Sequence, residues 1–478
     1  MHHIPYSLLF EFFNFDEKMT LVTINKQFKD LIYTHVRVYW FFSDDYYDTN
    51  KAPRTFKNFK TDVEGAGPKF KDHLTEFTGL ISLQFANDCN LSDTELLTLT
   101  QLEDLEIPGK SNITNNSISQ LTKLTCLLLG ENDAITDAAI SNLLELETLI
   151  LTGNKKITTQ ALFDLHNLKK LTPSNNINLT SSNATKFINL ESLNLSNNTL
   201  ITDDGISKLT NLQSLTVNKN ITDSGLTPLI NLKYLLLIEN EIITGESISK
   251  LTNLETLMTG GKEINDSILM QLTKLTGLIF GCQDLITKKS LSKLPNLIDL
   301  SLYSNESIQD EDIIVLTNLK ILEISDYSAI TNNALRHFPK LKSLRLTNNE
   351  KLTSKGLMEA KNLRSLQLSQ HNKLSNNHLK KLTNLTELDI RRSKDITDKG
   401  LKGLNITKLN LGNNHQITFD GIQSLKQLKK LKITRENYIP RSKQLAVLKN
   451  YVKIEIQASE QDSDDEDSDD QSIEENEI

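Results

Sequence analysis

The sequence predicts an α/β solenoid built from about seventeen repeats of 22 residues, with parallel strands on its concave face. Leucines return at a nearly constant step of 22 residues between Leu80 and Leu428. Each is followed by a short alternation of apolar and polar residues, the pattern of a strand with one buried face. A second apolar cluster follows each strand, so every unit needs a like unit on both sides to bury its apolar residues.

The stretch Asn189–Thr210, NLESLNLSNNTLITDDGISKLT, shows the plan of one repeat. Leu193 and Leu195 are two residues apart, so they share the buried face of a strand, and the residues between and around them face the other way. A tight turn follows at Asn198. Either residue of the pair 202–203 can then cap a short helix that carries further apolar residues into the core.

A constant 22-residue step of this kind is typical of leucine-rich repeats, and the units are identified as members of that family. An asparagine recurs three residues after the last strand leucine of many units. In leucine-rich repeats a stacked asparagine side chain satisfies the backbone of the buried turn, so these residues are predicted to be structural. They are Asn132, Asn154, Asn176, Asn198, Asn220, Asn240, Asn305, Asn349 and Asn414.

Two units depart from the regular pattern. Pro173 stands where a strand leucine belongs, and proline cannot donate to the hydrogen-bond ladder, so a locally broken strand is predicted there. The step from Leu212 to Leu232 is only twenty residues. It shortens the turn and the convex segment, which predicts tighter curvature at that point.

Composition divides the chain into four parts. Residues 1–42 are rich in aromatic residues and read as short amphipathic helices. Residues 43–76 form a linker and N-terminal cap, and residues 77–457 form the solenoid, whose last strand around Ile454 covers the open edge of the sheet. Residues 458–478 are predicted to be a disordered acidic tail, because they hold eleven acidic residues and no basic ones.

The N-terminal part carries the order Ile-Pro, Leu-Leu, Phe-Phe, a short acidic turn and I-N-K-Q-F. It resembles an F-box, whose usual pattern is L-P-x-E-L-L followed by V-x-x-x-W, with Phe in place of the common Trp. The segments 135–137 and 221–223, both Ile-Thr-Asp, also resemble the ITDxGL segment of F-box leucine-rich-repeat proteins.

The F-box resemblance implies docking onto the small adaptor subunit of a cullin-RING ubiquitin ligase. The alternative is a helical cap whose apolar residues shield the first repeat, because solenoid ends need covering. The residues at the contact positions of the family are Ile4, Pro5, Leu8, Leu9, Phe12, Ile24 and Phe28.

Large apolar residues gather on the solvent-facing strand positions of the central units, where most other units have small or polar residues. Stacked strands lie about 4.8 Å apart, so these residues are predicted to form one continuous patch that binds a protein partner. The alternatives are a terminal element folded over the patch, or a register shifted by one residue. The residues are Tyr234, Leu236, Ile238, Met258, Ile279, Tyr303 and Ile321.

Charge is predicted to matter at two places. Toward the end of the array the same face becomes charged, with Arg345, Glu387, Asp389, Arg391, Lys430 and Lys432, and this predicts a polar rim. The formal net charge of −8 contains the eleven acidic residues of the tail, so the rest of the chain sums to +3. A nearly neutral body argues against nucleic-acid binding.

Several classes of function are excluded by the residue types. The three cysteines, Cys89, Cys126 and Cys282, form no CxxC pair, so neither a disulfide framework nor a zinc site is indicated. No His lies in register with a Cys or Ser and an orienting acid, so no catalytic residues and no cofactor are predicted. No signal peptide or membrane span is recognised, which favours the cytoplasm or the nucleus.

These expectations combine into a non-enzymatic substrate receptor. The N-terminal helices would hold the ubiquitin-ligase adaptor while the concave face recruits a protein substrate. The alternative is a leucine-rich-repeat scaffold or phosphatase regulator in which the N-terminal helices are only a cap.

Overall fold

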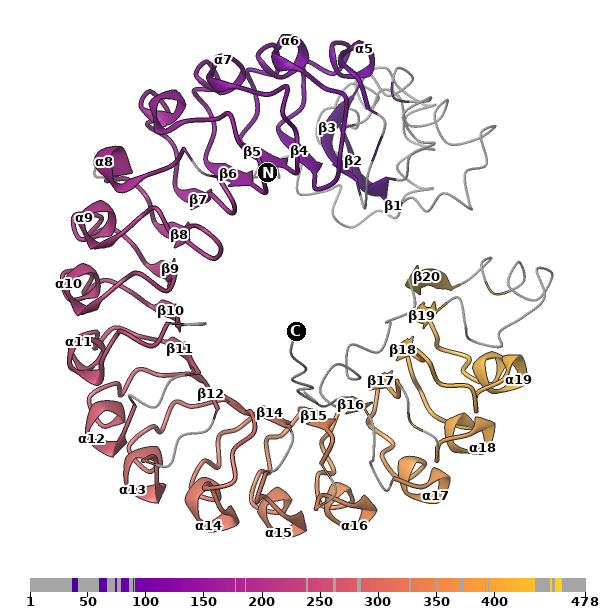
Figure 1. Cartoon of the computed structure of the whole chain (residues 1–478). Helices are drawn as coiled ribbons and strands as arrows, with labels where there is room; N and C mark the ends of the chain where they lie inside the picture. Colours follow the sequence, from indigo (N-terminus) through magenta and orange to yellow (C-terminus); the bar gives the residue numbers. More distant parts are fainter. Residues whose placement is uncertain are drawn as a thin grey trace, which may run out of the picture. The chain divides into compact units, whose positions relative to one another are not determined.

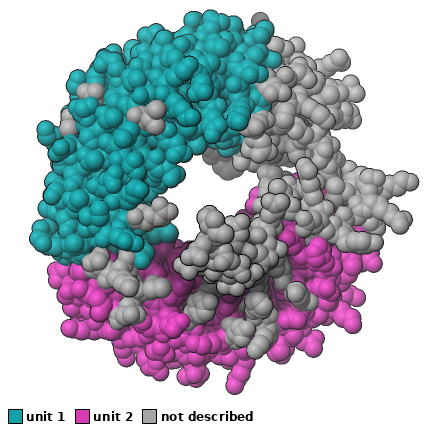
Figure 2. Space-filling model, viewed as in Figure 1, with its two compact units in different colours: residues 1–263 teal, residues 264–478 magenta. Residues whose placement is uncertain are grey.

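The chain folds as a leucine-rich-repeat solenoid, as the sequence predicts. The computed structural model describes residues 37–41, 60–66, 74, 79–85, 89, 91–176, 178–184, 186–237, 240–260, 264–281, 285–325, 328–349, 351–369, 374–391, 393, 395–434, 448 and 452–457. They belong to two compact units, residues 1–263 and residues 264–478 (Figure 2). Within each unit, strands line one side of the repeats and short helices line the other (Figure 1).

In the first unit, neighbouring strands pair in parallel in the order of the sequence. They are β3 (Leu80–Phe85), β4 (Asp104–Ile107), β5 (Cys126–Leu129), β6 (Thr148–Leu151), β7 (Lys170–Thr172), β8 (Ser192–Asn194), β9 (Ser214–Thr216), β10 (Tyr234–Leu237) and β11 (Thr256–Thr259). The helices that follow are α5 (Asp93–Leu96), α6 (Asn115–Ile118), α7 (Asp137–Ile140), the 3-10 helix η3 (Thr159–Leu162), α8 (Ser181–Ala184), α9 (Asp203–Ile206), α10 (Asp223–Leu226) and α11 (Gly245–Ser249).

The second unit repeats this plan. Its strands are β12 (Gly277–Phe280), β13 (Asp299–Leu302), β14 (Ile321–Ile324), β15 (Ser343–Thr347), β16 (Ser365–Ser369), β17 (Glu387–Asp389), β18 (Lys408–Asn410), β19 (Lys430–Thr434) and β20 (Lys453–Gln457). Its helices are α12 (Asp266–Leu269), α13 (Lys288–Leu291), α14 (Asp310–Ile313), α15 (Asn332–Leu335), α16 (Ser354–Leu357), α17 (Asn376–Leu379), α18 (Asp398–Leu401) and α19 (Phe419–Gln423). Strands β3 to β19 correspond one for one to the seventeen predicted units.

Further strands continue the sheet beyond the predicted units. Strand β2 (Lys60–Ala66) pairs with β3, and β1 (Arg37–Phe41) pairs with β2, both in parallel. They lie in segments that the sequence assigns to the helical module and to the linker. At the other end, β20 pairs in parallel with β19, which confirms the predicted last strand. The predicted helices of residues 1–36 and the acidic tail lie outside the described residues.

A buried asparagine ladder holds the turns that follow the strands. Nδ2 of Asn198 donates to the carbonyls of Asn176 and Leu179 in the preceding repeat, at 3.2 and 3.3 Å. Its Oδ1 accepts the amides of Leu200 and Ile201, both at 3.1 Å. One amide side chain thus satisfies two coils, which confirms the predicted structural role.

One predicted member of this ladder is wrong. Asn220 is exposed, and Asn218 takes the buried place, with its Nδ2 donating to the carbonyls of Asn198 and of Ile201 (2.9 Å). The repeat of twenty residues has lost two residues between its strand and Ile221. The ladder asparagine therefore follows the strand two positions earlier than in a regular unit.

A second ladder links the helices of successive repeats, and it explains the Ile-Thr-Asp segments. In these segments the threonine is the N-cap of the helix, and the aspartate that follows it accepts hydrogen bonds from the threonine of the next repeat. Asp203 Oδ1 accepts the Thr222 amide at 2.8 Å, and Asp223 does the same for Thr244 at 2.9 Å. At Gly225 a Cβ would press against the carboxylate of Asp203, so glycine allows the closest approach of the two repeats.

Pro173 interrupts the pairing of its strand. Strand β7 is as long as β8 and β9, but only two residue pairs join it to β8, whereas three pairs join β8 to β9. In the following repeat the equivalent residue, Leu195, donates its amide to the carbonyl of Thr216 at 2.9 Å, a bond that proline cannot make. The hydroxyl of Ser174 instead donates to the carbonyl of Ser196 at 3.2 Å. The hydrogen-bond ladder is therefore interrupted at Pro173, and a side-chain hydrogen bond joins the two repeats just beyond it.

Candidate protein-binding surface

Tyr234, Leu236 and Met258 form an apolar cluster on the strand face of the first unit. Leu236 lies directly opposite Met258 on the neighbouring strand, and Tyr234 lies opposite Thr256. Tyr234 is 43% exposed, whereas the alternate residue Leu235 is fully buried. The predicted register is therefore correct, and these three side chains face away from the core. Ile238 lies outside the described residues.

The same face carries an apolar pair that sequence reasoning missed. Leu128 of β5 lies opposite Ile150 of β6, and both are half-buried. They occupy the outward strand position of Leu236, so the period-two alternation of their own units was the signal that could have found them. The first unit therefore holds two separate apolar clusters, with Thr172 and Asn194 between them.

Cys126 borders the Leu128–Ile150 pair, on the same strand face. Burial raises the pKa of its thiol to about 11, and the nearby carboxylates of Asp104 and Glu106 add to this effect. The thiol therefore stays protonated at neutral pH, whereas a nucleophile needs the thiolate. This cysteine is suited to packing against a partner and not to catalysis.

In the second unit the predicted apolar residues do not form a continuous patch. Ile279 lies opposite Ser301, while Ile321, which is 41% exposed, lies between Asp299 and Ser343 on the neighbouring strands. Tyr303 follows the end of β13 and is half-buried. The expectation of a continuous apolar surface is therefore wrong in this unit, because acidic and hydroxyl side chains lie between its members.

Polar side chains of four consecutive strands form a hydrogen-bonded chain across this face. Ser301 donates to Glu323 at 3.2 Å, and Nη1 of Arg345 donates to the same carboxylate oxygen at 2.9 Å. Nε of Arg345 also donates to Gln367 at 2.9 Å. Because Glu323 is held on both sides, its side chain is only 14% exposed. This hydrogen-bonded network of side chains presents an ordered arrangement of donors and acceptors to solvent.

The acidic side of this network alters two neighbouring groups. Burial raises the pKa of Asp299, and the charge of Glu323 raises it further. Burial also raises the pKa of Tyr303, and the charge of Glu323 and a hydrogen bond to it raise the pKa further, so the phenol stays protonated and bonded to Glu323. An apolar contact at Ile321 would thus come with polar contacts on either side.

The predicted charged rim lies on strands β15 to β19. Lys408 Nζ lies 2.7 Å from Glu387 Oε1, and Arg391 Nε lies 3.1 Å from Asp389 Oδ2. Asn410 donates to the same Asp389 oxygen at 2.9 Å. Lys430 and Lys432 occupy the same two rows on β19. Such surface pairs contribute little to stability, so they remain open to exchange for a partner's charges.

Among the residues that the structure describes, no group of three His, Cys, Asp or Glu side chains is placed to hold a metal ion. None of the helices in the described ranges is long and apolar enough to cross a membrane. The predicted adaptor contacts, Ile4, Pro5, Leu8, Leu9, Phe12, Ile24 and Phe28, lie outside the described residues.

Comparison with known proteins finds the repeats. A family model described as Leucine Rich repeat matches residues 188–210, 338–359 and 381–404. Each matched segment spans one strand and the helix behind it, from β8 to α9, from β15 to α16 and from β17 to α18. A search of curated proteins finds no match.

Solved structures with a similar chain course include three proteins. An internalin (inlF) from Listeria monocytogenes is 25% identical, with a TM-score of 0.40 over 67% of this chain and 88% of that chain. The TLR13–ssRNA13 complex is 20% identical, with a TM-score of 0.47 over 75% of this chain and 70% of that chain. The Toll–Spatzle complex of Drosophila is 15% identical, with a TM-score of 0.44 over 88% of this chain and 62% of that chain.

Proposed function

We propose that this chain is a non-enzymatic receptor that captures a protein on the strand face of its repeats. The observation that carries the proposal is the exposure of large apolar side chains on strands whose alternate residues are fully buried. Tyr234 and Ile321 are 43% and 41% exposed, next to Leu235 and Leu322 at 0%. Large apolar side chains that point away from the core and are left exposed favour a binding role.

The chemistry of the two units suits a protein partner of mixed polarity. The Tyr234 cluster offers an aromatic ring and a thioether, two groups that are enriched at protein interfaces. The network around Glu323 and Arg345 offers charged groups in fixed positions, which select a partner more than they add affinity. Within the second unit, Ile321 and this network fit a partner that has an apolar anchor and neighbouring charges.

The receptor proposal is tested with the full-length chain as bait. Tyr234→Ala with Leu236→Asp is expected to lose the proteins that the wild type retains, as measured by quantitative mass spectrometry. The matched control is Ser192→Ala with Asn194→Asp, which changes the same two positions on β8 and is expected to retain them. The thermal midpoint of both variants should stay near that of the wild type. A large fall in the thermal midpoint of the Tyr234→Ala, Leu236→Asp variant would show that these side chains belong to the core.

The F-box resemblance extends the proposal to a ubiquitin ligase. In this reading residues 1–42 hold the adaptor subunit. The bound protein is brought close to a ubiquitin-conjugating enzyme that carries ubiquitin, so proximity accelerates the transfer of ubiquitin. Wild type should co-purify with the adaptor, and Leu8→Asp with Leu9→Asp should lose it while keeping the partners of the strand face. A wild-type chain that fails to bind purified adaptor would remove the ligase part and leave the receptor part standing.

One observation supports a cap on a leucine-rich-repeat scaffold. Strands β1 and β2 extend the sheet from β3, so the chain from Arg37 onward already covers the first repeat. In the alternative reading the predicted helices before Arg37 would then cap β1, a role that needs no adaptor. That alternative predicts that Leu8→Asp with Leu9→Asp lowers the thermal stability of the first repeats and changes no interaction.

A further inference from the structure

Charge is distributed very unevenly along the chain. Residues 336–458 contain 26 lysines and arginines against nine aspartates and glutamates, whereas residues 1–335 contain 27 against 41. The nearly neutral body expected from the overall sum is therefore a cancellation of two opposite regions. The basic region is followed directly by residues 459–478, which hold eleven acidic residues and no basic ones.

An open groove on the flank of the second unit collects part of this positive charge. It has a volume of about 670 Å³ and is lined by Lys320, Pro339, Lys340, Lys342, Asn362, Arg364, Asn384 and Thr386. Four of these eight residues are cationic, and none is acidic. Nζ of Lys340 donates to Oδ1 of Asn318, a residue of the preceding repeat, at 2.6 Å. The groove lies beside the strand face, so it is separate from the surface proposed above to hold a protein.

Three of these cations stack directly on one another. Lys320, Lys342 and Arg364 hold the same position in three consecutive repeats, each just before its strand, and their backbones are joined by hydrogen bonds of 2.8 Å. Neighbouring repeats therefore place like charges side by side, which is unfavourable. At the same position of the first unit, Lys169 instead pairs with Glu147 at 3.0 Å, and Lys233 pairs with Glu255 at 3.8 Å. Binding of an anionic group would relieve the repulsion within this row of like charges.

We propose that the acidic segment 459–478 of the same chain docks in this groove. Its charge is the complement of the groove, and it carries no lysine or arginine that would be repelled. It also begins two residues after β20, in the same unit as the groove. Tethering gives a segment of this kind an effective concentration of about 1 mM, which an untethered acidic partner rarely reaches.

The segment is long enough to reach the groove. The pairing order β15 to β20 places the repeat of Lys342 five strands from the end of the array. Five strand spacings correspond to about 24 Å. Twenty residues span up to about 65 Å when extended, so the acidic residues can cross this distance and run along the groove.

The location is tested by coupling carboxylates directly to lysine amines with a carbodiimide in the full-length chain. The expected result is that the acidic segment couples mainly to Lys320, Lys340 and Lys342 within one molecule, and that about 0.5 M salt suppresses this, because screening weakens exposed charge pairs. Equal coupling to Lys288 and Lys289 on α13, or coupling only between two copies of the chain, would overturn the proposal.

The strength of docking is tested by competition. A labelled synthetic peptide of residues 458–478 should bind about tenfold more tightly to a variant whose eleven acidic residues are changed to Asn or Gln than to the wild type, because the tethered segment no longer competes. In that neutral background Lys340→Glu with Lys342→Glu should abolish binding, and Lys288→Glu with Lys289→Glu should not. Equal affinity for wild type and neutral variant contradicts the proposal. Tighter binding of a single-stranded RNA of the same length, with the same lysine dependence, would assign the groove to nucleic acid instead.

Discussion

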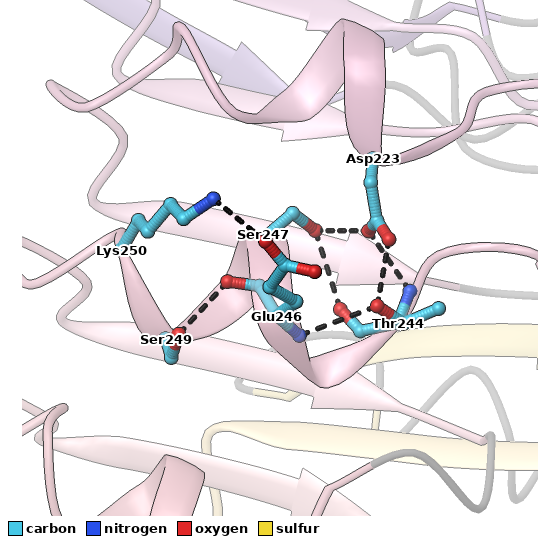
Figure 3. Close-up of polar contacts among 6 residues, drawn as sticks. All are labelled: Asp223, Thr244, Glu246, Ser247, Ser249 and Lys250. Atoms are coloured by element: carbon cyan, nitrogen blue, oxygen red, sulfur yellow. Dashed lines mark hydrogen bonds and ion pairs between the residues drawn. The ribbon is translucent and has the colours of Figure 1, made fainter.

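The carboxylate of Asp223 is bound by three donors of the next repeat (Figure 3). The amide and hydroxyl of Thr244 donate to its two oxygens at 2.9 and 2.6 Å, and the hydroxyl of Ser247 donates to Oδ1. Burial alone would raise the pKa of Asp223, but these hydrogen bonds outweigh it and hold the pKa below its ordinary value. Asp93 and Asp266 show the same lowered pKa, and each is also bonded by a serine and a threonine.

This arrangement predicts a pH-dependent contribution of Ser247. Because the folded pKa of Asp223 lies below the unfolded value, its stabilisation is present above the unfolded pKa of about 4 and is lost as pH falls through the folded pKa. Ser247→Ala removes one donor and should cost about 1 kcal/mol at pH 7, since the carboxylate is partly solvated. In thermal melts the difference from wild type should shrink below about pH 3.5, where the unfolded state binds the proton.

The control for this prediction lies on the same helix. The hydroxyl of Ser249 donates to the carbonyl of Glu246 at 2.8 Å and touches no carboxylate (Figure 3). Ser249→Ala should change stability by less than about 0.5 kcal/mol at every pH. A difference between wild type and Ser247→Ala that persists unchanged at pH 2.5 would show that the serine stabilises the chain by packing alone.

At the scale of the element, the turn after β9 shows what a deletion does to a ladder. Regular units place the buried asparagine three residues after the last strand leucine, but here Asn218 follows Val217 directly. Oδ1 of Asn218 accepts the amide of Asn220 at 2.8 Å, and its Nδ2 is shared by two carbonyls of the repeat below. The ladder is continued upward by Asn240, which donates to the Asn218 carbonyl at 2.7 Å. Spatial continuity of the ladder thus takes precedence over spacing in the sequence.

Two substitutions in this turn should therefore differ widely. Asn218→Ala leaves two buried carbonyls and an amide without their partner and should cost about 3 kcal/mol of unfolding free energy. Asn220→Ala removes one exposed hydrogen bond, to the carbonyl of Thr199 at 2.9 Å, and should cost less than about 0.5 kcal/mol. Urea denaturation followed by circular dichroism compares them. A larger loss for Asn220→Ala would restore the assignment made from spacing.

At the scale of the molecule, sequence periodicity predicts whatever is buried and local. The step of 22 residues locates every strand from β3 to β19, because a leucine in the core cannot be replaced by a polar residue without cost. Interactions between repeats are harder to find. Asn211 and Asn253 donate to the carbonyls of Ile188 and Ile230 on the exposed flank, and nothing in a single repeat distinguishes them from ordinary surface asparagines.

The candidate surface was only partly predicted. The alternation of Tyr234, Leu235 and Leu236 predicts correctly which side chains leave the core. The 22-residue step also places Ser301 opposite Ile279 and Asp299 opposite Ile321, so the interruption of the patch was present in the sequence and was missed. Leu128 and Ile150 follow the same alternation, but they lie outside the central units to which the predicted patch was confined. Strands β1 and β2 were missed because their segments lack the leucine pattern.

The repeat architecture predicts that damage stays local. In a solenoid each repeat packs only against its neighbours, so stability is close to a sum of repeat and interface terms. Leu149 of β6 and Leu235 of β10 are both fully buried, and replacement of either by Ala should cost about 3 kcal/mol. Hydrogen exchange measured by mass spectrometry should show Leu149→Ala raising amide exchange in β5 to β7 while β10 and β11 keep theirs. Leu235→Ala, the matched control in the same unit, should show the reverse: amide exchange becomes faster in β9 to β11 and stays unchanged in β5. A uniform rise from β3 to β11 in either variant would mean that the first unit unfolds as one cooperative body, and that its repeats do not act as independent neighbours.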